Sequence, residues 1–156
     1  MLTATISIVV VTALAAIVNG VMIATGGKEL FKSVLENAGL GGMSDGDLDL
    51  AAQLAGYDSL DSYLSAFAMR GYLAIAGGAA LLLFGLLMRK VATWARVLVT
   101  ISAALTMVFS VIIVGGDSNT TMAGLGMLAI LGAILSIIFT WLPANGRYGK
   151  ALRAAG

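Results

Sequence analysis

Apolar and polar positions divide the chain into four long apolar runs, one polar stretch after the first run, and short polar links between the others. The runs cover about residues 2–25, 71–88, 94–114 and 122–142. A helix needs roughly 20 mostly apolar residues to cross a bilayer, and Arg96 is the only charged residue inside the runs. Transmembrane β-strands alternate instead of running continuously apolar. The pattern therefore predicts an all-α fold, an antiparallel four-helix transmembrane bundle forming a single membrane domain over residues 1–156.

The polar stretch, residues 26–70, has a helical pattern of its own. Leu30, Phe31 and Val34 repeat at helical spacing, which predicts an amphipathic helix that either lies on the membrane or continues the first span, with Gly39 ending it. A second helix is expected from Ser44 to near Gly56. A third, capped by Asp58 or Ser59, can run unbroken into the second apolar run, giving about 30 residues or ~45 Å. We expect a small helical cap between the first and second spans.

Charges in the links predict the orientation. Six basic residues flank the link between spans two and three or follow span four, and these are Arg89, Lys90, Arg96, Arg147, Lys150 and Arg153. Residues 26–70 contain three basic and seven acidic residues, a net charge of −4. The positive-inside rule then places both termini in the cytoplasm and the 26–70 cap outside a plasma membrane. The six basic residues, including those of the tail 143–156, are predicted to contact lipid headgroups.

The first run differs from a cleavable signal peptide, because no basic residue precedes it and its apolar stretch is longer than usual. We expect this span to be retained. Cleavage near Ala24-Thr25-Gly26 is the alternative.

The amino-acid composition limits the kinds of environment, partner and active site that the chain can have. The chain is 60% hydrophobic and 11% charged, against about 45–50% and about 25% for soluble domains, so lipid is its expected solvent. A net charge of +1 gives no reason to expect nucleic acid as a partner. The chain contains no cysteine and no histidine, which excludes thiolate nucleophiles and the commonest metal and haem ligands. We expect no cofactor, no metal site and no catalytic residue.

The acidic stretch around residues 45–49 invites comparison with a calcium loop. An EF-hand requires Gly at position six and Glu at position twelve, but counting from Asp45 these positions hold Leu50 and Gly56. We therefore interpret Asp45, Asp47 and Asp49 as residues of a helix N-terminus on an exposed surface, available to a partner. Weak binding of a divalent cation is the alternative.

Mildly polar residues form two stripes within the spans. Thr5, Thr12 and Asn19 recur every seven positions, and Ser102, Thr106 and Ser110 every four. Interhelical hydrogen bonding explains such stripes. The alternative is a polar lining that contacts a headgroup, a quinone-like ligand or another subunit, with Asn19, Ser102, Thr106 and Ser110 as the candidate partner contacts. Small residues four apart, such as Ala16–Gly20–Ala24 and Ala74–Gly78, indicate close helix packing.

Two short motifs, one at the start of the third span and one at the end of the fourth, resemble motifs of a known group of membrane proteins. Trp94-Ala95-Arg96-Val97 opens the third span and Trp141-Leu142-Pro143-Ala144-Asn145 closes the fourth. This pattern of interface anchors resembles small, largely uncharacterised four-span membrane proteins of high-GC Gram-positive bacteria. The resemblance covers roughly residues 70–148, and it implies a plasma-membrane location without implying a reaction.

The expected function follows from the absence of ionisable residues in the middle of the predicted spans. The spans lack an ionisable residue at mid-depth, which a proton-coupled transporter would need. We expect a non-catalytic accessory or assembly subunit that packs against other membrane protein subunits. The first alternative is a homo-oligomeric module that binds or transports a lipid or another lipophilic molecule. A weaker alternative is an envelope enzyme that uses the carboxylates of the cap.

Overall fold

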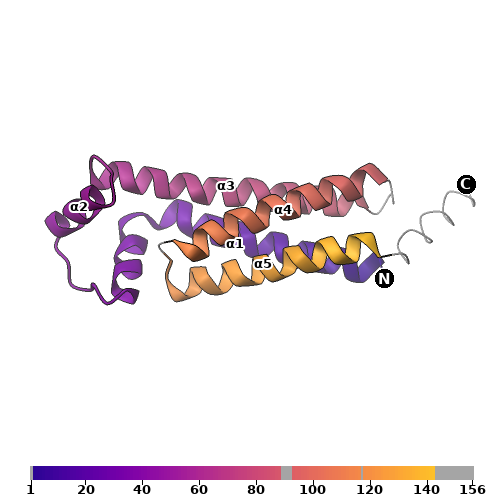
Figure 1. Ribbon diagram of the computed structural model, residues 1–156, viewed down its shortest axis with the longest axis horizontal. Coiled ribbons are helices and arrows are strands. Elements are labelled where there is room, and N and C mark those ends of the chain that lie inside the picture. Colours follow the sequence, from indigo (N-terminus) through magenta and orange to yellow (C-terminus); the bar gives the residue numbers. More distant parts are fainter. Residues whose placement is uncertain (1, 89–92, 117, 143–156) are drawn as a thin grey trace, which may run out of the picture.

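The computed structural model describes residues 2–88, 93–116 and 118–142, and in these residues every regular element is a helix (Figure 1). The helices are α1 (Leu2–Asn37), α2 (Asp45–Leu54), α3 (Leu60–Leu87), α4 (Thr93–Gly115) and α5 (Thr120–Trp141). Four of them are long and apolar enough to cross a membrane, which indicates a multi-pass membrane protein. For the described residues, the predictions of an all-helical fold and of four long apolar helices are confirmed.

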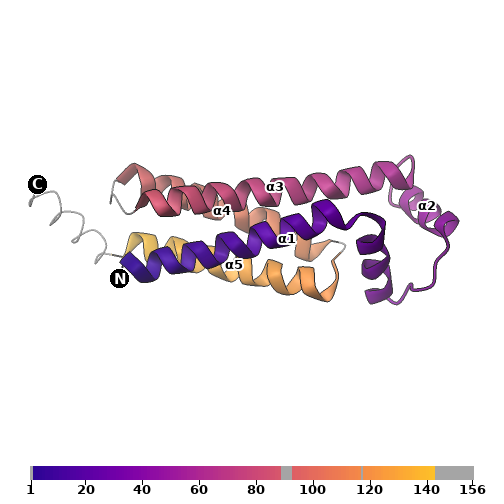
Figure 2. The same ribbon diagram turned by 180° about the vertical axis from the view of Figure 1, so that it is seen from behind.

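The four long helices lie side by side along the long axis of the molecule (Figures 1 and 2). The helix α2 lies at one end, and the N-terminus lies at the other. We call these the α2 end and the N-terminal end.

Glycines bring α1 and α3 into backbone contact. A Cβ atom added at Gly71 of α3 would lie 2.6 Å from the carbonyl oxygen of Gly20 in α1. Gly78 meets the backbone of Ala13 and Ile17 in the same way, whereas Gly85 makes room for the side chain of Val9. At Gly71 and Gly78 no side chain separates the two backbones, which therefore approach closely and gain many weak van der Waals contacts.

The helix α1 continues beyond the predicted end of the first span but turns sharply at Gly27. This residue has φ 48° and ψ −139°, a combination that glycine adopts far more readily than residues with a side chain. Figure 2 shows the resulting change of direction. Residues 28–37 therefore form a separate short segment, and its predicted apolar face, Leu30, Phe31 and Val34, is buried.

The predicted helix boundaries between residues 38 and 60 are confirmed. After α1, Gly39 adopts φ 80° and Leu40 donates a hydrogen bond to the carbonyl of Leu35, as in a Schellman motif. Ser44 and Ser59 cap α2 and α3, each in a capping box. Because Ser59 starts a helix that continues to Leu87, α3 is 28 residues long, about 42 Å.

The last two helices begin and end close to their predicted bounds. Asn119 caps α5 by accepting a hydrogen bond from the backbone N–H of Met122. At the other end of α5, Leu142 has ψ 137°, an extended conformation favoured immediately before a proline. In the sequence the next residue is Pro143.

Candidate functional site

The predicted polar stripes of α1 and α4 lie inside the chain's own bundle. Each of their six residues is at most 4% exposed, and these are Thr5, Thr12, Asn19, Ser102, Thr106 and Ser110. The hydroxyls of Thr12 and Thr106 donate to carbonyls of their own helices, at Ile8 and Ser102, over 2.8 Å. Asn19 bonds across helices, as predicted, with its side-chain Nδ2 donating to the Met122 carbonyl of α5 over 3.3 Å.

A seam of small and polar groups continues between α1 and α5. A Cβ at Gly132 would clash with the side chain of Thr12, and a Cβ at Gly126 would lie 3.7 Å from the Asn19 Nδ2. Two buried oxygens, the Asn19 Oδ1 and the Ser136 Oγ, have no hydrogen-bond partner among the described residues. The small residues therefore let the two helices pack closely. The Asn19 Oδ1 and the Ser136 Oγ stay without a hydrogen-bond partner there, within the part of the chain that the structure describes.

Asp45 binds two lysines of the segment after the Gly27 turn. Its carboxylate lies 2.7 Å from the Lys28 Nζ and 3.9 Å from the Lys32 Nζ. The hydrogen bond from Lys28, followed by the charges of both lysines, lowers the pKa of Asp45 below its ordinary value of 3.8. These ion pairs are solvent-exposed, so they orient residues 28–37 against the start of α2 more than they stabilise the fold.

Asp47 and Asp49 serve helix ends. Asp47 Oδ2 accepts hydrogen bonds from the Ser44 hydroxyl at 2.6 Å and the Ser44 backbone N–H at 2.9 Å, and these bonds lower the pKa of Asp47. Asp49 accepts from the backbone N–H of Leu60, the first residue of α3, over 2.8 Å. Asp47 thus completes the capping box at the start of α2, where the sequence predicted it, whereas Asp49 lies beyond the first turn of α2 and bonds α3 instead.

No group of three metal-ligating side chains that could hold an ion occurs among the described residues. Asp45, Asp47 and Asp49 lie close in sequence, but their ion-pair and hydrogen-bond partners are lysines, a serine, a glutamine and a backbone amide. Binding of a divalent cation at this stretch stays a hypothesis.

An aromatic cluster joins the pieces of the 26–70 segment. Tyr63 of α3 packs against Phe31 at a ring-centroid distance of 4.6 Å, against Tyr57 at 5.0 Å and against Phe67 at 6.0 Å. Leu48 and Ala52, from one face of α2, are buried in the same core. The segment therefore has a packed core of its own and is not an irregular loop.

The segment is also tied to the start of α5. The Asn119 side chain donates to the Ser33 hydroxyl over 3.0 Å, and the Thr120 hydroxyl donates to the Asn37 side chain over 3.2 Å. Residues 28–37 therefore contact both α2 and the α4–α5 link.

Most of the predicted headgroup residues lie outside the described residues, namely Arg89, Lys90, Arg147, Lys150 and Arg153. Arg96 is described and is half-buried in the first turn of α4. Nearby, the Trp141 indole donates to the Thr100 hydroxyl over 2.9 Å, and the Trp94 and Trp141 side chains are exposed. Exposed tryptophans near helix ends are typical of a membrane interface.

A groove of about 410 Å³ opens on the surface between α1 and α5. Its sides are apolar, and Thr12 and Gly132 are among its lining residues. A smaller hollow of about 260 Å³ lies in the 26–70 segment, beside Lys32, Glu36 and Leu48. The sequence pattern did not single out either hollow, since each depends on which helices are neighbours.

Two features with a readable signal were missed. Gly71, Gly78 and Gly85 repeat every seven residues in α3, which predicts one helix face. The second missed feature is an exposed apolar pair in α2. Leu50 and Leu54, four residues apart, are exposed, whereas Leu48 and Ala52 are buried.

Comparison with protein families, with curated proteins and with solved structures gives no match. The resemblance to four-span proteins of high-GC Gram-positive bacteria stays an expectation.

Proposed function

We propose that this protein is a non-catalytic accessory or assembly subunit that packs against a larger complex of the plasma membrane. In this proposal the four long helices are antiparallel spans, both termini are cytoplasmic, and residues 26–70 are extracytoplasmic, with residues 28–59 as the cap at the end of the bundle. Contacts between α1 and α5 support the antiparallel arrangement, because Thr12 meets Gly132 whereas Asn19 meets Met122 and Gly126.

The observation that carries the proposal is the attachment of the cap. The cap is joined to the projecting end of α3 by the Tyr63 aromatic cluster and to α5 by the Asn119–Ser33 hydrogen bond, and the Lys28–Asp45 ion pair holds its two helical segments together. A segment fixed at several points presents a constant surface. Preorganisation of this kind lowers the entropic cost of binding a partner.

Native assembly size tests the role. A tagged chromosomal copy extracted in mild detergent should migrate as a stoichiometric complex much larger than its 15.9 kDa chain. A species that contains this chain alone, with retained lipid, would contradict the accessory role and support the alternative below.

The topology is tested separately. Because the chain has no cysteine, a single Asp58→Cys substitution creates a unique site for a membrane-impermeant maleimide. Intact cells should be labelled at this position but not at Ala92→Cys in the predicted cytoplasmic link. The reverse pattern would invert the proposed orientation.

One observation favours a second candidate, a module that binds a lipid or another lipophilic molecule. The α1–α5 groove is apolar and lies in the part of the molecule predicted to contact hydrocarbon. A Ser7→Phe substitution at its edge should reduce lipid retained after purification, while Ile101→Phe on the exposed face of α4 should not. Equal lipid retention in both variants would remove the support for this candidate.

A further inference from the structure

The helix α2 has an apolar residue pair on the face that does not contact the molecule. Leu48 and Ala52 are fully buried, whereas Leu50 is 55% and Leu54 81% exposed. At 100° per residue these pairs lie on opposite sides of the helix. The inner pair accounts for the attachment of α2, and the structure offers no intramolecular reason for the outer pair.

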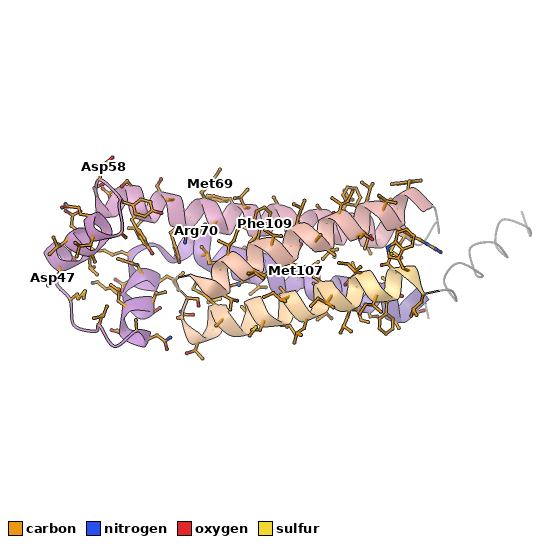
Figure 3. All side chains as sticks on the ribbon, viewed as in Figure 1. Asp47, Asp58, Met69, Arg70, Met107 and Phe109 are labelled. Carbon is orange, nitrogen blue, oxygen red and sulfur yellow. The ribbon has the colours of Figure 1, made fainter. Side chains whose placement is uncertain are left out.

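The position of α2 places this face beyond the region where lipid would cover it. Gly71 of α3 is level with Gly20 and Ala24 of α1, and the Arg70 guanidinium lies beside Gly116, just after α4. Residues 60–70 of α3 consequently extend past the four-helix region by about 16 Å. Figure 3 shows Asp47 and Asp58 at the far end of this extension, beyond Arg70.

The surroundings of the exposed pair are strongly acidic. Residues 28–61 contain seven acidic and two basic residues, and the two basic ones, Lys28 and Lys32, both pair with Asp45. Asp47 lies three residues before Leu50 and seven before Leu54, so it shares their helix face, and it is exposed. Hydrogen bonds from Ser44 lower its pKa, and it is therefore ionised at neutral pH.

We propose that Asp47, Leu50 and Leu54 form a docking face for a basic extracytoplasmic segment, with its own apolar residues, of a larger membrane subunit. This inference rests on the accessory-subunit role and deepens it by naming the surface and the chemistry of the partner. The leucines supply the apolar area at the centre of the contact, and the carboxylates attract and orient the partner. A second copy of this chain would bring a like-charged face, whose repulsion disfavours self-association here.

Site-specific photocrosslinking in intact cells tests the docking face. A benzoylphenylalanine placed at Leu54 should give one crosslinked protein, whose attached peptide, identified by mass spectrometry, carries Lys or Arg beside apolar residues. The same probe at Ser65, an exposed position of α3, should give about tenfold less of this product. In isolated membranes the yield should fall as salt is raised from about 0.05 to about 0.5 M, since salt screens exposed charges.

A double substitution tests whether the crosslink depends on the two exposed leucines. L50Q/L54Q changes only exposed side chains, so helix content and melting temperature should match those of a Ser65→Gln control. The crosslink, with the probe moved to Gln53, should fall about tenfold, the equivalent of about 1.4 kcal/mol.

Four results would overturn the docking face: crosslinks only to a second copy, crosslinks to an acidic peptide, no crosslink, or a crosslink unchanged in L50Q/L54Q. If the large native complex persists in any of these cases, the accessory role stands and the docking face alone fails. If the chain is recovered without other subunits, both fail.

Discussion

The side-chain amide of Asn19 in α1 donates a hydrogen bond to the backbone carbonyl of Met122 at the start of α5, over 3.3 Å. These residues are 103 positions apart, and Asn19 is 2% exposed. The bond therefore fixes the depth at which the first and last helices meet.

Replacing Asn19 by Leu should lower stability by about 1 kcal/mol, within the range measured for hydrogen bonds between membrane helices. The loss is limited because the Asn19 Oδ1 has no partner, so its removal relieves an unsatisfied buried acceptor. Thermal unfolding in detergent measures the effect. Thr12→Val is the matched control, since Thr12 bonds only its own helix; equal losses in both variants would argue against a special role for Asn19.

Gly71→Ala should destabilise the bundle by about 3 kcal/mol, at the upper end of the range for overpacking, because the new methyl group would meet the backbone of Gly20 and Ala24 at 2.6 Å. Gly124→Ala in α5 has open space around it and should be neutral or stabilising by up to about 1 kcal/mol. Chemical or thermal unfolding of the two variants under identical conditions compares them. Similar stabilities would contradict the close contact of α1 and α3.

Gly27→Ala should disturb the placement of residues 28–37, because an alanine at φ 48°, ψ −139° costs about 1–3 kcal/mol. A short thiol crosslinker joining Ser33→Cys and Asn119→Cys reports this placement, since the two native side chains are 3.0 Å apart. The crosslinking yield should fall in Gly27→Ala and remain unchanged in Gly46→Ala, which has a helical backbone and space for a methyl group. An unchanged yield in both would show that the turn does not depend on glycine.

The contact between residues 28–37 and α2 should loosen in acid. The pKa values of Asp45 and Asp47 are lower in the folded protein than their ordinary value of 3.8, so folding favours their charged forms. Their contribution is complete well above pH 3.8, and it is lost as the pH falls through the lowered folded values.

Hydrogen exchange of residues 45–54, corrected for intrinsic rates and compared with that of α3, measures this acid effect. The D45N/D47N variant should exchange faster at neutral pH and respond less to acid. Glu29→Gln, which removes the same type of charge from an exposed position, should behave as the unmodified chain does. Equal exchange rates in the wild type and in D45N/D47N at neutral pH would contradict the role of these carboxylates.

Local signals made much of this fold predictable. The ends of α2 and α3 follow from Ser44, Gly56 and Ser59, whose backbone preferences act within one helical turn. The apolar runs gave the bounds of α4 and α5 to within two residues. Features that depend on neighbouring helices could not be predicted. Gly26 and Gly27 both permit a turn, and the structure places it at Gly27, where Leu30 and Phe31 become part of the core shared with α3.

The candidate site was less predictable for the same reason. Asp47 was correctly expected at the N-terminus of α2, but the sequence spacing cannot reveal that Asp49, expected there too, accepts a hydrogen bond from the first residue of α3. Asn19 was expected to bond a neighbouring helix, although the pattern could not name α5. The exposure of Leu54 required knowing which side of α2 faces the aromatic cluster.

The direct meeting of α1 and α3 backbones has a consequence for the integrity of the chain. Gly39, Gly41 and Gly42 lie in the exposed connection before Ser44, where a protease would cut most readily. Cleavage there would separate the polypeptide into two pieces whose helices remain interlocked through Gly20 and Gly71. The protein should therefore survive nicking at this point, and its halves, produced from two separate messages, should reassemble in the bilayer.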